Sequence, residues 1–276
     1  MSHRDPSHSQ DDQGPRRLRA IFDQDAALYD AARPGFPEAL FEDLVALSGV
    51  PPGGRILEVG CGTGQATLPL ARRGYRSLCV ELGARLAAVA REKLAGYPLV
   101  AIWNGSFEAW PLEEASFDLV VAANAFHWVD PAIGYPKAAA ALRPGGSIAL
   151  CWHRHVHTDR DPGFFAAAPE VYRREAPEIV REPAAPTRAH EQPATVAHEM
   201  ADTGLFGPVA LRRYRWDVEY DAAGYTRLLE TYSEHRNLAP ERRERLLRGI
   251  AALIDTRFGG KITKGYMADL YVARRL

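Results

Sequence analysis

The sequence lacks any run of about 18 apolar residues, the length that an α-helix needs to cross a membrane. Its first residues, MSHRDPSHSQDDQGPRRLR, are polar and have no apolar core of the kind found in signal peptides. Cysteine is scarce. The chain has three cysteines, Cys61, Cys79 and Cys151. Because their number is odd and no two form a CxxC motif, a disulfide framework is not expected. These absences predict a cytoplasmic protein without a membrane span.

An excess of charge of one sign is also lacking. The 34 Lys and Arg residues are balanced by 35 Asp and Glu residues, which gives a formal net charge of -1. Proteins that bind the phosphate backbone of nucleic acids usually have a basic face, so no nucleic-acid partner is predicted. The chain does have 46% hydrophobic residues over 276 positions, enough for the core of a single α/β domain.

Short apolar runs alternate with helical patterns in the first half of the chain. Strands are expected at residues 55–60, 76–82, 99–106, 117–124 and 147–153. Because these runs are apolar throughout, they indicate parallel strands that are covered on both faces by the intervening helices. Two further helices precede them, with a break at Arg33-Pro34-Gly35.

The remaining segments differ from this rhythm. Residues 1–16 are polar and are predicted to form a disordered tail before a single domain at 17–276. Residues 154–208 are rich in proline and have no strong strand pattern, so we expect an insertion that forms a lid over the sheet and binds the acceptor. Strands at 211–220 and 265–275 are expected to flank a helical segment at 222–255.

The strongest local pattern is LEVGCGTGQAT, an apolar strand that runs into Gly60, Gly62 and Gly64 before a helix. Glycines at such a turn let the backbone approach a ligand, and the helix start offers free N–H groups. The third glycine comes one residue earlier than in the dinucleotide fingerprint GxGxxG. Glu58 precedes the loop, where a carboxylate suits an ammonium group. Glu81 ends the next strand, where a carboxylate can bind ribose hydroxyls.

Several segments in order resemble the class I S-adenosylmethionine-dependent methyltransferases. They are LEVGCGTG, the acid Glu81, NGSFEAWPL, SFDLVVAANAFHWVDP and LRPGGSIAL. The chain is most similar to the small-molecule group that includes trans-aconitate methyltransferase and the quinone-ring C-methyltransferases. This resemblance implies a Rossmann-like α/β fold: a seven-stranded, mostly parallel sheet with its last strand antiparallel and helices on both faces. It also implies S-adenosyl-L-methionine as cofactor and a small-molecule acceptor.

The resemblance further implies which residues contact the cofactor. They are Tyr29, Arg33, Glu58, Gly60, Gly62, Gly64, Glu81, Leu82, Ser106, Phe107 and Asn124. Glu58 and the Gly60 backbone would face the methionine ammonium group, and Asn124 would lie beside the methionine portion. Glu81 would hold the ribose. Leu82, Ser106 and Phe107 would surround the adenine, although many relatives have an acid in place of the serine. Tyr29 and Arg33 could close the pocket.

Two strands are expected to end at the same crevice, with the sequences NAFHWVD and CWHRHVH. His127 and His153 are therefore candidate catalytic residues, as a general base or in positioning the acceptor. Phe126 and Trp128 could wall the acceptor pocket and favour a sulfonium cation. Equally, His127 could be a structural residue, because methyl transfer can proceed by proximity alone.

Three histidines, His153, His155 and His157, alternate along this segment and raise the alternative of a metal site. We expect the segment to leave the sheet after residue 153, and no acid or cysteine is spaced to complete a ligand set. No metal is therefore predicted. Two alternatives to a methyltransferase stay open at this point. One is an NAD(P)-dependent oxidoreductase, and the other is a non-catalytic, cofactor-binding regulatory domain on the same fold.

Overall fold

The computed structural model describes residues 25–180 and 195–276. A seven-stranded sheet in the order β3-β2-β1-β4-β5-β7-β6 forms its centre. The strands are β1 (Arg55–Val59), β2 (Arg76–Glu81), β3 (Val100–Asn104), β4 (Phe117–Ala123), β5 (Leu142–Val156), β6 (Ala210–Asp221) and β7 (Lys261–Arg274). Strands β1 to β5 pair in parallel, and β7 runs antiparallel to both β5 and β6. The predicted fold class is therefore confirmed.

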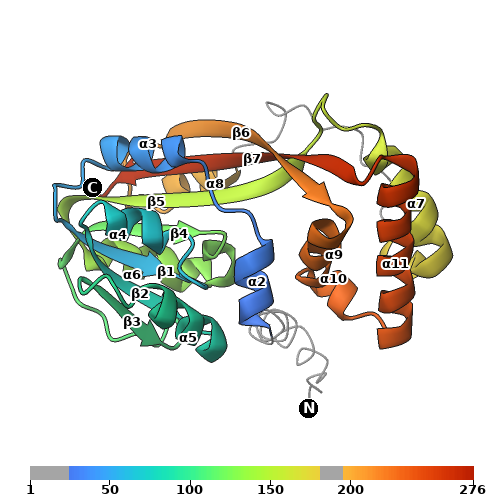
Figure 1. The fold of residues 1–276 in the computed structure, drawn as a ribbon. Helices are drawn as coiled ribbons and strands as arrows, with labels where there is room; N and C mark the ends of the chain where they lie inside the picture. Colours follow the sequence, from blue (N-terminus) through green and yellow to red (C-terminus); the bar gives the residue numbers. More distant parts are fainter. Residues whose placement is uncertain (1–24, 181–194) are drawn as a thin grey trace, which may run out of the picture.

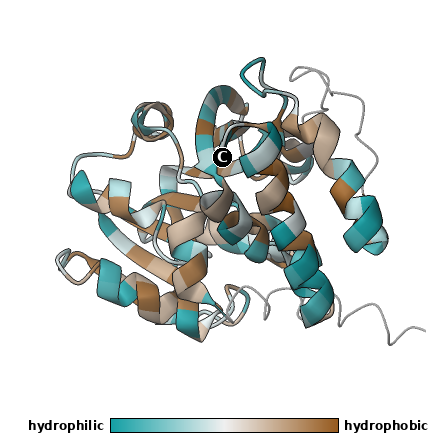
Figure 2. Ribbon diagram, turned by 45° about the vertical axis from the view of Figure 1, so that its right-hand side comes forward, coloured by the Kyte–Doolittle hydropathy of each residue, from teal (hydrophilic) through white to brown (hydrophobic). Residues whose placement is uncertain are grey.

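Helices cover both faces of this sheet (Figure 1). On one face lie α3 (Glu38–Ser48), α4 (Thr67–Arg72) and α5 (Ala84–Lys93), and on the other α6 (Pro131–Ala141) and α8 (Thr195–Asp202). Apolar strand residues such as Ile56, Leu119 and Leu150 are fully buried between these layers. In Figure 2 hydrophilic and hydrophobic residues alternate in bands along the helices, as expected of amphipathic helices that cover a core.

A second helical layer stands at one end of the long strands β6 and β7 (Figure 1). It contains α7 (Phe164–Glu175), α9 (Ala222–Glu230), α10 (Ser233–Arg236) and α11 (Pro240–Arg257). Residues of α7, α9 and α11 form one hydrophobic cluster, to which Tyr232 and Leu238 on either side of α10 also belong. We call these four helices the cap. The short α2 (Ala26–Ala32) lies between the cap and the β1–β3 half of the sheet and contacts both α5 and α9.

The expected strands are all present, but β5 is longer than predicted. It begins at Leu142 and continues to Val156, where its last residues pair with β7. Pro144, Gly145 and Gly146 lie inside this span as a bulge, since the pairing with β4 jumps from Leu142 to Ser147. The expectation that the chain leaves the sheet after His153 was wrong, because β7 offers partners beyond the end of β4.

The predicted insertion at 154–208 has parts in two places. Its α7 belongs to the cap, whereas Met200 on α8 is buried in the core cluster beside α6. The 3-10 turn η2 (Pro177–Ile179) follows α7. The role of the segment as a lid stays a prediction, and the predicted tail at 1–16 lies outside the described residues. In the two described ranges, no helix is long and apolar enough to cross a membrane.

Candidate active site

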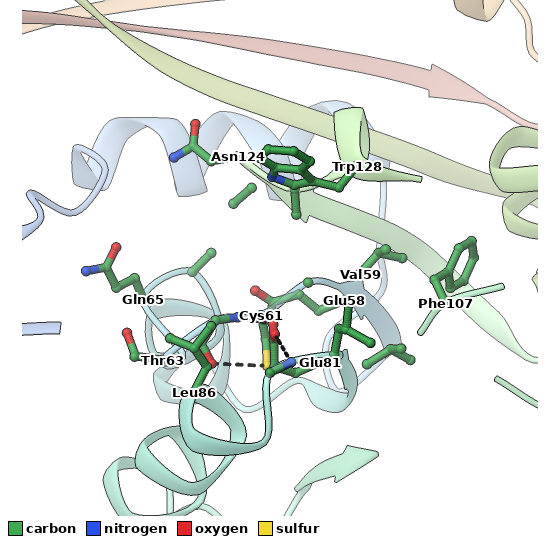
Figure 3. A pocket seen from close by; sticks show the side chains of 18 of the residues that line it. Glu58, Val59, Cys61, Thr63, Gln65, Glu81, Leu86, Phe107, Asn124 and Trp128 are labelled. Atoms are coloured by element: carbon green, nitrogen blue, oxygen red, sulfur yellow. Dashed lines mark hydrogen bonds between the residues drawn. The ribbon is translucent and has the colours of Figure 1, made fainter. Parts of the chain in front are cut away.

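A cavity of about 570 Å³ opens at the carboxyl ends of β1, β2 and β4, with the end of β5 and the α2 region completing its wall. This is the edge at which ligands bind in open α/β sheets. Figure 3 shows Glu58, Cys61 and Glu81 on one side of the cavity, with Asn124 and Trp128 across from them. The cavity therefore brings together residues from the glycine loop and from the loop after β4.

The glycine loop has the conformation that its sequence predicts. Gly60, Gly62 and Gly64 have φ values of 71°, 57° and 82°, in the left-handed region that disfavours other residues. A Cβ atom on Gly60 would lie 2.4 Å from the Cβ atom of Ala125, so the loop after β4 excludes a side chain there. Gly60 and Gly62 line the cavity. Gly64 faces Leu94, directly after α5, and is not among the lining residues.

Glu81, at the end of β2, is bound to this loop through its carboxylate. Its Oε2 accepts a hydrogen bond from the Gly62 N–H and its Oε1 accepts one from the Gly83 N–H, both at 2.7 Å. The side chain is nearly buried, with 7% exposed, yet lines the cavity. Because a carboxylate oxygen can accept more than one hydrogen bond, a carboxylate at this place suits both the loop N–H groups and hydroxyl groups of a ligand.

Glu58 lines the cavity, and one oxygen of its carboxyl group is buried without a hydrogen-bond partner among the described atoms. Burial raises the pKa of this carboxyl to about 7, although hydrogen bonds from Thr67 and Cys79 oppose the shift. Its Oε2 accepts from the Thr67 hydroxyl at 2.6 Å, whereas Oε1 is buried without a partner among the described atoms. A buried acceptor left unpaired costs about 1–3 kcal/mol. A cationic donor in the cavity would satisfy it.

The wall formed by Leu82, Ser106 and Phe107 is mainly apolar. Leu82 is 46% exposed although it is a large hydrophobic residue, and it lines the cavity. Phe107 is buried and stacks on Trp110, with ring centroids 6.1 Å apart. The Ser106 hydroxyl accepts a hydrogen bond from the Ala109 N–H at 3.2 Å. The wall therefore suits a flat apolar group such as a nucleobase.

Asn124, directly after β4, is one of two non-glycine residues with positive φ in the described chain, at 53°. Its Oδ1 accepts from the backbone N–H of His153 and its Nδ2 lies 2.9 Å from the His153 Nδ1. Because the first bond fixes the orientation of the amide, Nδ2 must donate to Nδ1. A neutral His153 consequently carries its proton on Nε2. Burial, with Arg33 and Lys264 nearby, lowers the pKa of His153 to about 4, so it is neutral.

His127 lies in the 3-10 turn η1 (Phe126–Trp128), is exposed, and lines the cavity. Its Nδ1 accepts a hydrogen bond from the Trp152 indole N–H at 2.9 Å. Trp128 also lines the cavity, as predicted. Phe126 does not, because its ring is buried against Tyr135 at 4.9 Å in the core beneath η1. The prediction that Phe126 walls the pocket is corrected accordingly.

Tyr29 and Arg33 line the cavity from the α2 side. The Arg33 guanidinium lies over the rings of Tyr29 and Tyr232, at 5.3 and 4.5 Å from their centroids. It also donates to the side-chain and backbone oxygens of Thr231. Arg33 therefore connects the cavity to the cap.

Some residues that line the cavity were not predicted, because no sequence motif marks them. They are Phe36, Gln65 and Trp152. Gln65 donates to the Arg33 carbonyl at 3.3 Å, and Trp152 holds His127. Trp152 could have been found from its place beside His153 at the end of an expected strand. In the described ranges, no three His, Cys, Asp or Glu side chains gather as a metal site would require.

The fold is shared with methyltransferases of known structure. Residues 57–150 match the family model described as a methyltransferase domain. A protein provisionally named a type II methyltransferase, from Anaeromyxobacter dehalogenans, has a similar structure. Its TM-score is 0.60 at 23% identity, over 88% of this chain and 97% of the other. This structural likeness shows the fold.

Curated sequences give a consistent result. An uncharacterised methyltransferase of Mycobacterium tuberculosis is 33% identical over 138 residues, which are 50% of this chain and 54% of the relative. A demethylmenaquinone methyltransferase of Clavibacter sepedonicus is 27% identical over 50% of this chain and 58% of its own length. The chain spans little more than half the length of these relatives, so their activities and substrates do not carry over directly.

Proposed function

We propose that this protein transfers a methyl group from S-adenosyl-L-methionine to a small-molecule acceptor. The observation that carries the proposal is the unpaired, buried Oε1 of Glu58 in the same cavity as the carboxylate of Glu81. The methionine ammonium group suits the first, and the ribose hydroxyls suit the second. The exposed face of Leu82 and the Phe107 wall fit the adenine.

Arg33 and Tyr29 would complete the cofactor site from α2, and Asn124 would border the methionine portion. S-adenosylmethionine supplies an electrophilic methyl group, so the protein needs chiefly to align an acceptor with it and to exclude water. The aromatic rings of Trp128, Trp152 and Phe36, which all line the cavity, suit both tasks and favour a cation nearby.

The hydrogen bonds support positioning rather than proton abstraction by His127 and His153. Each has its Nδ1 occupied as an acceptor, from Trp152 and Asn124 respectively. In the neutral ring the remaining nitrogen, Nε2, then bears the proton. Such a histidine donates a hydrogen bond to an acceptor molecule and has no open lone pair to act as a base.

These contacts do not support the dehydrogenase alternative, because Glu58 lines the cavity beside the glycine loop and its carboxylate would repel a diphosphate. The regulatory alternative differs from the proposal only in turnover. The test is release of S-adenosylhomocysteine when the protein is incubated with S-adenosylmethionine and a metabolite extract. We expect release that is lost in the Glu81→Ala variant. Cofactor binding without release from any extract would favour the regulatory domain.

A further inference from the structure

The short helix α2 is tied to the cap at both of its ends. At its start, the carboxylate of Asp25 lies 3.5 Å from the guanidinium of Arg236 on α10. At its end, the C-cap residue Arg33 contacts the turn between α9 and α10, which consists of Thr231 and Tyr232. A helix of seven residues is too short to be stable by itself in water. The position of α2 therefore depends on these contacts and on its packing against α5.

Thr231 fixes the direction of the Arg33 side chain. Its hydroxyl oxygen accepts a hydrogen bond from Nε of Arg33 at 2.8 Å, and its backbone carbonyl accepts one from Nη2 at 3.1 Å. The same hydroxyl donates to the carbonyl of Leu228 at 2.6 Å, which orients its lone pairs toward the guanidinium. Thr231 is 4% exposed, so both roles of its hydroxyl are met inside the protein.

Two tyrosine rings restrict the same guanidinium further. It lies over the ring of Tyr29 on α2 and the ring of Tyr232 in the cap, at 5.3 and 4.5 Å from their centroids. A free arginine side chain has many rotamers, and a ligand that must fix it loses affinity for doing so. Arg33 is thus held in one place before any ligand binds, and the cap supplies most of the contacts that hold it.

These contacts leave part of Arg33 open to the cavity that it lines. A guanidinium has five N–H groups, and Thr231 accepts from two of them, which leaves three. Its Nη1 makes no hydrogen bond to a described residue and is not fully buried. In the described ranges no carboxylate pairs with Arg33. The remaining N–H groups therefore suit a carboxylate of a ligand, which an arginine binds through two parallel hydrogen bonds.

We propose that Thr231 is a positioning residue of the cofactor site, which holds Arg33 so that its open N–H groups bind the carboxylate of S-adenosylmethionine. The proposal rests on the proposed function and adds the cap to it, because Thr231 does not itself line the cavity. Without the threonine hydroxyl, Nε of Arg33 would lose its acceptor and the guanidinium would no longer be fixed in direction.

Calorimetry with S-adenosylhomocysteine tests this in wild type, Thr231→Val, Thr231→Ser and Thr226→Val. Valine keeps the shape of threonine without the hydroxyl, and serine keeps the hydroxyl. Thr226 is a matched control on α9, since its hydroxyl also donates to helix carbonyls but accepts from no arginine in the described chain. We expect Thr231→Val to weaken binding by about fivefold or more, and the other two variants to stay within about twofold of wild type.

A double-mutant cycle with Arg33→Ala separates positioning from a general structural effect. In the Arg33→Ala background, Thr231→Val should weaken binding by less than about 1.5-fold, because the side chain that it positions is gone. The ligand 5′-methylthioadenosine, which has no carboxylate, should bind wild type and Thr231→Val equally. Equal binding of this ligand also shows that the variant is folded with an intact nucleoside site.

The inference is overturned if Thr231→Val binds S-adenosylhomocysteine as wild type does, if Thr231→Ser fails to restore binding, or if the loss is the same in both backgrounds. An equal loss for 5′-methylthioadenosine would overturn it as well. In each of these cases the wild type still binds S-adenosylhomocysteine, and the proposed function stands. No binding of S-adenosylhomocysteine by folded wild type would instead overturn the proposed function, and this inference with it.

Discussion

The amide of Asn124 makes two hydrogen bonds to His153, one to its backbone N–H and one to its ring Nδ1, each at 2.9 Å. This pair joins the ends of β4 and β5 and fixes the tautomer of the imidazole. It determines that His153 offers a donor to the cavity. An aspartate at position 124 would keep the backbone contact but could not donate to Nδ1.

Asn124→Asp is therefore expected to raise the pKa of His153 from about 4, because a carboxylate stabilises the imidazolium. The rise should be about one unit or more. NMR titration of the imidazole signals measures it, with Asn237→Asp, at an exposed position, as control. An unchanged pKa of His153 in Asn124→Asp would show that the two side chains are not paired in solution.

The low pKa of His153 also makes the free energy of unfolding depend on pH. The unfolded chain binds a proton at this ring below about 6.5, whereas the folded protein does so only near 4. Stability contributed by the neutral ring is therefore lost as the pH falls through this window, by up to about 1.4 kcal/mol per pH unit. His153→Gln should reduce the slope by one proton in urea unfolding at pH 4.5–6.5. An identical slope in both proteins would contradict the assignment.

Glu58 also predicts a pH dependence, here of cofactor affinity, because its pKa is raised whereas that of His153 is lowered. Because its pKa is about 7, much of this carboxyl is protonated in the free protein at neutral pH. An ammonium group at Oε1 requires the ionised form, so affinity should rise between pH 6 and 7 by up to about tenfold. Calorimetry with S-adenosylhomocysteine measures this. Glu58→Gln should remove the pH dependence, and a wild-type affinity that is flat with pH would argue against the contact.

Gly60 gives a prediction about folding. Gly60→Ala places a methyl group 2.4 Å from Ala125 Cβ, in addition to the strain of its positive φ. We expect a loss of about 2–4 kcal/mol in the free energy of unfolding. Gly62→Ala meets open space and should lose only about 1–2 kcal/mol. The double variant Gly60→Ala/Ala125→Gly should recover part of the lost free energy of unfolding, as measured by chemical denaturation. If none is recovered, the close approach to Ala125 is not the cause of the loss.

The arrangement of the strands could be predicted because their apolar runs and the glycine loop are local patterns. The place of Glu81 in the cavity was predictable for the same reason, since the end of its strand and the glycine loop lie at the same edge of the sheet. The length of β5 beyond His153 depends on pairing with β7, more than a hundred residues away, and the bulge near its start lies in the pairing with β4. No periodicity near residue 153 could indicate that partner.

The residues of the candidate site also divide into those that local sequence patterns predicted and those that depend on the tertiary structure. Tyr29, Trp128 and His153 lie on the cavity as their positions beside strand or helix ends suggested. Phe126 does not, because a 3-10 turn directs successive side chains to different sides, and no local sequence pattern indicated that turn. Lys264 lies one residue before the expected strand, and the packing of the cap over β7 buries it.

The central claim is that this cavity binds S-adenosylmethionine through Glu81 and Glu58. Isothermal titration calorimetry of the wild-type protein and Glu81→Ala tests it most directly, with Glu113→Ala as control, an acid that pairs only with Arg55 in the described chain. We expect one cofactor bound per chain, and an affinity that falls by about tenfold or more in Glu81→Ala and is unchanged in Glu113→Ala. No detectable binding by folded wild-type protein at millimolar S-adenosylmethionine would contradict the account.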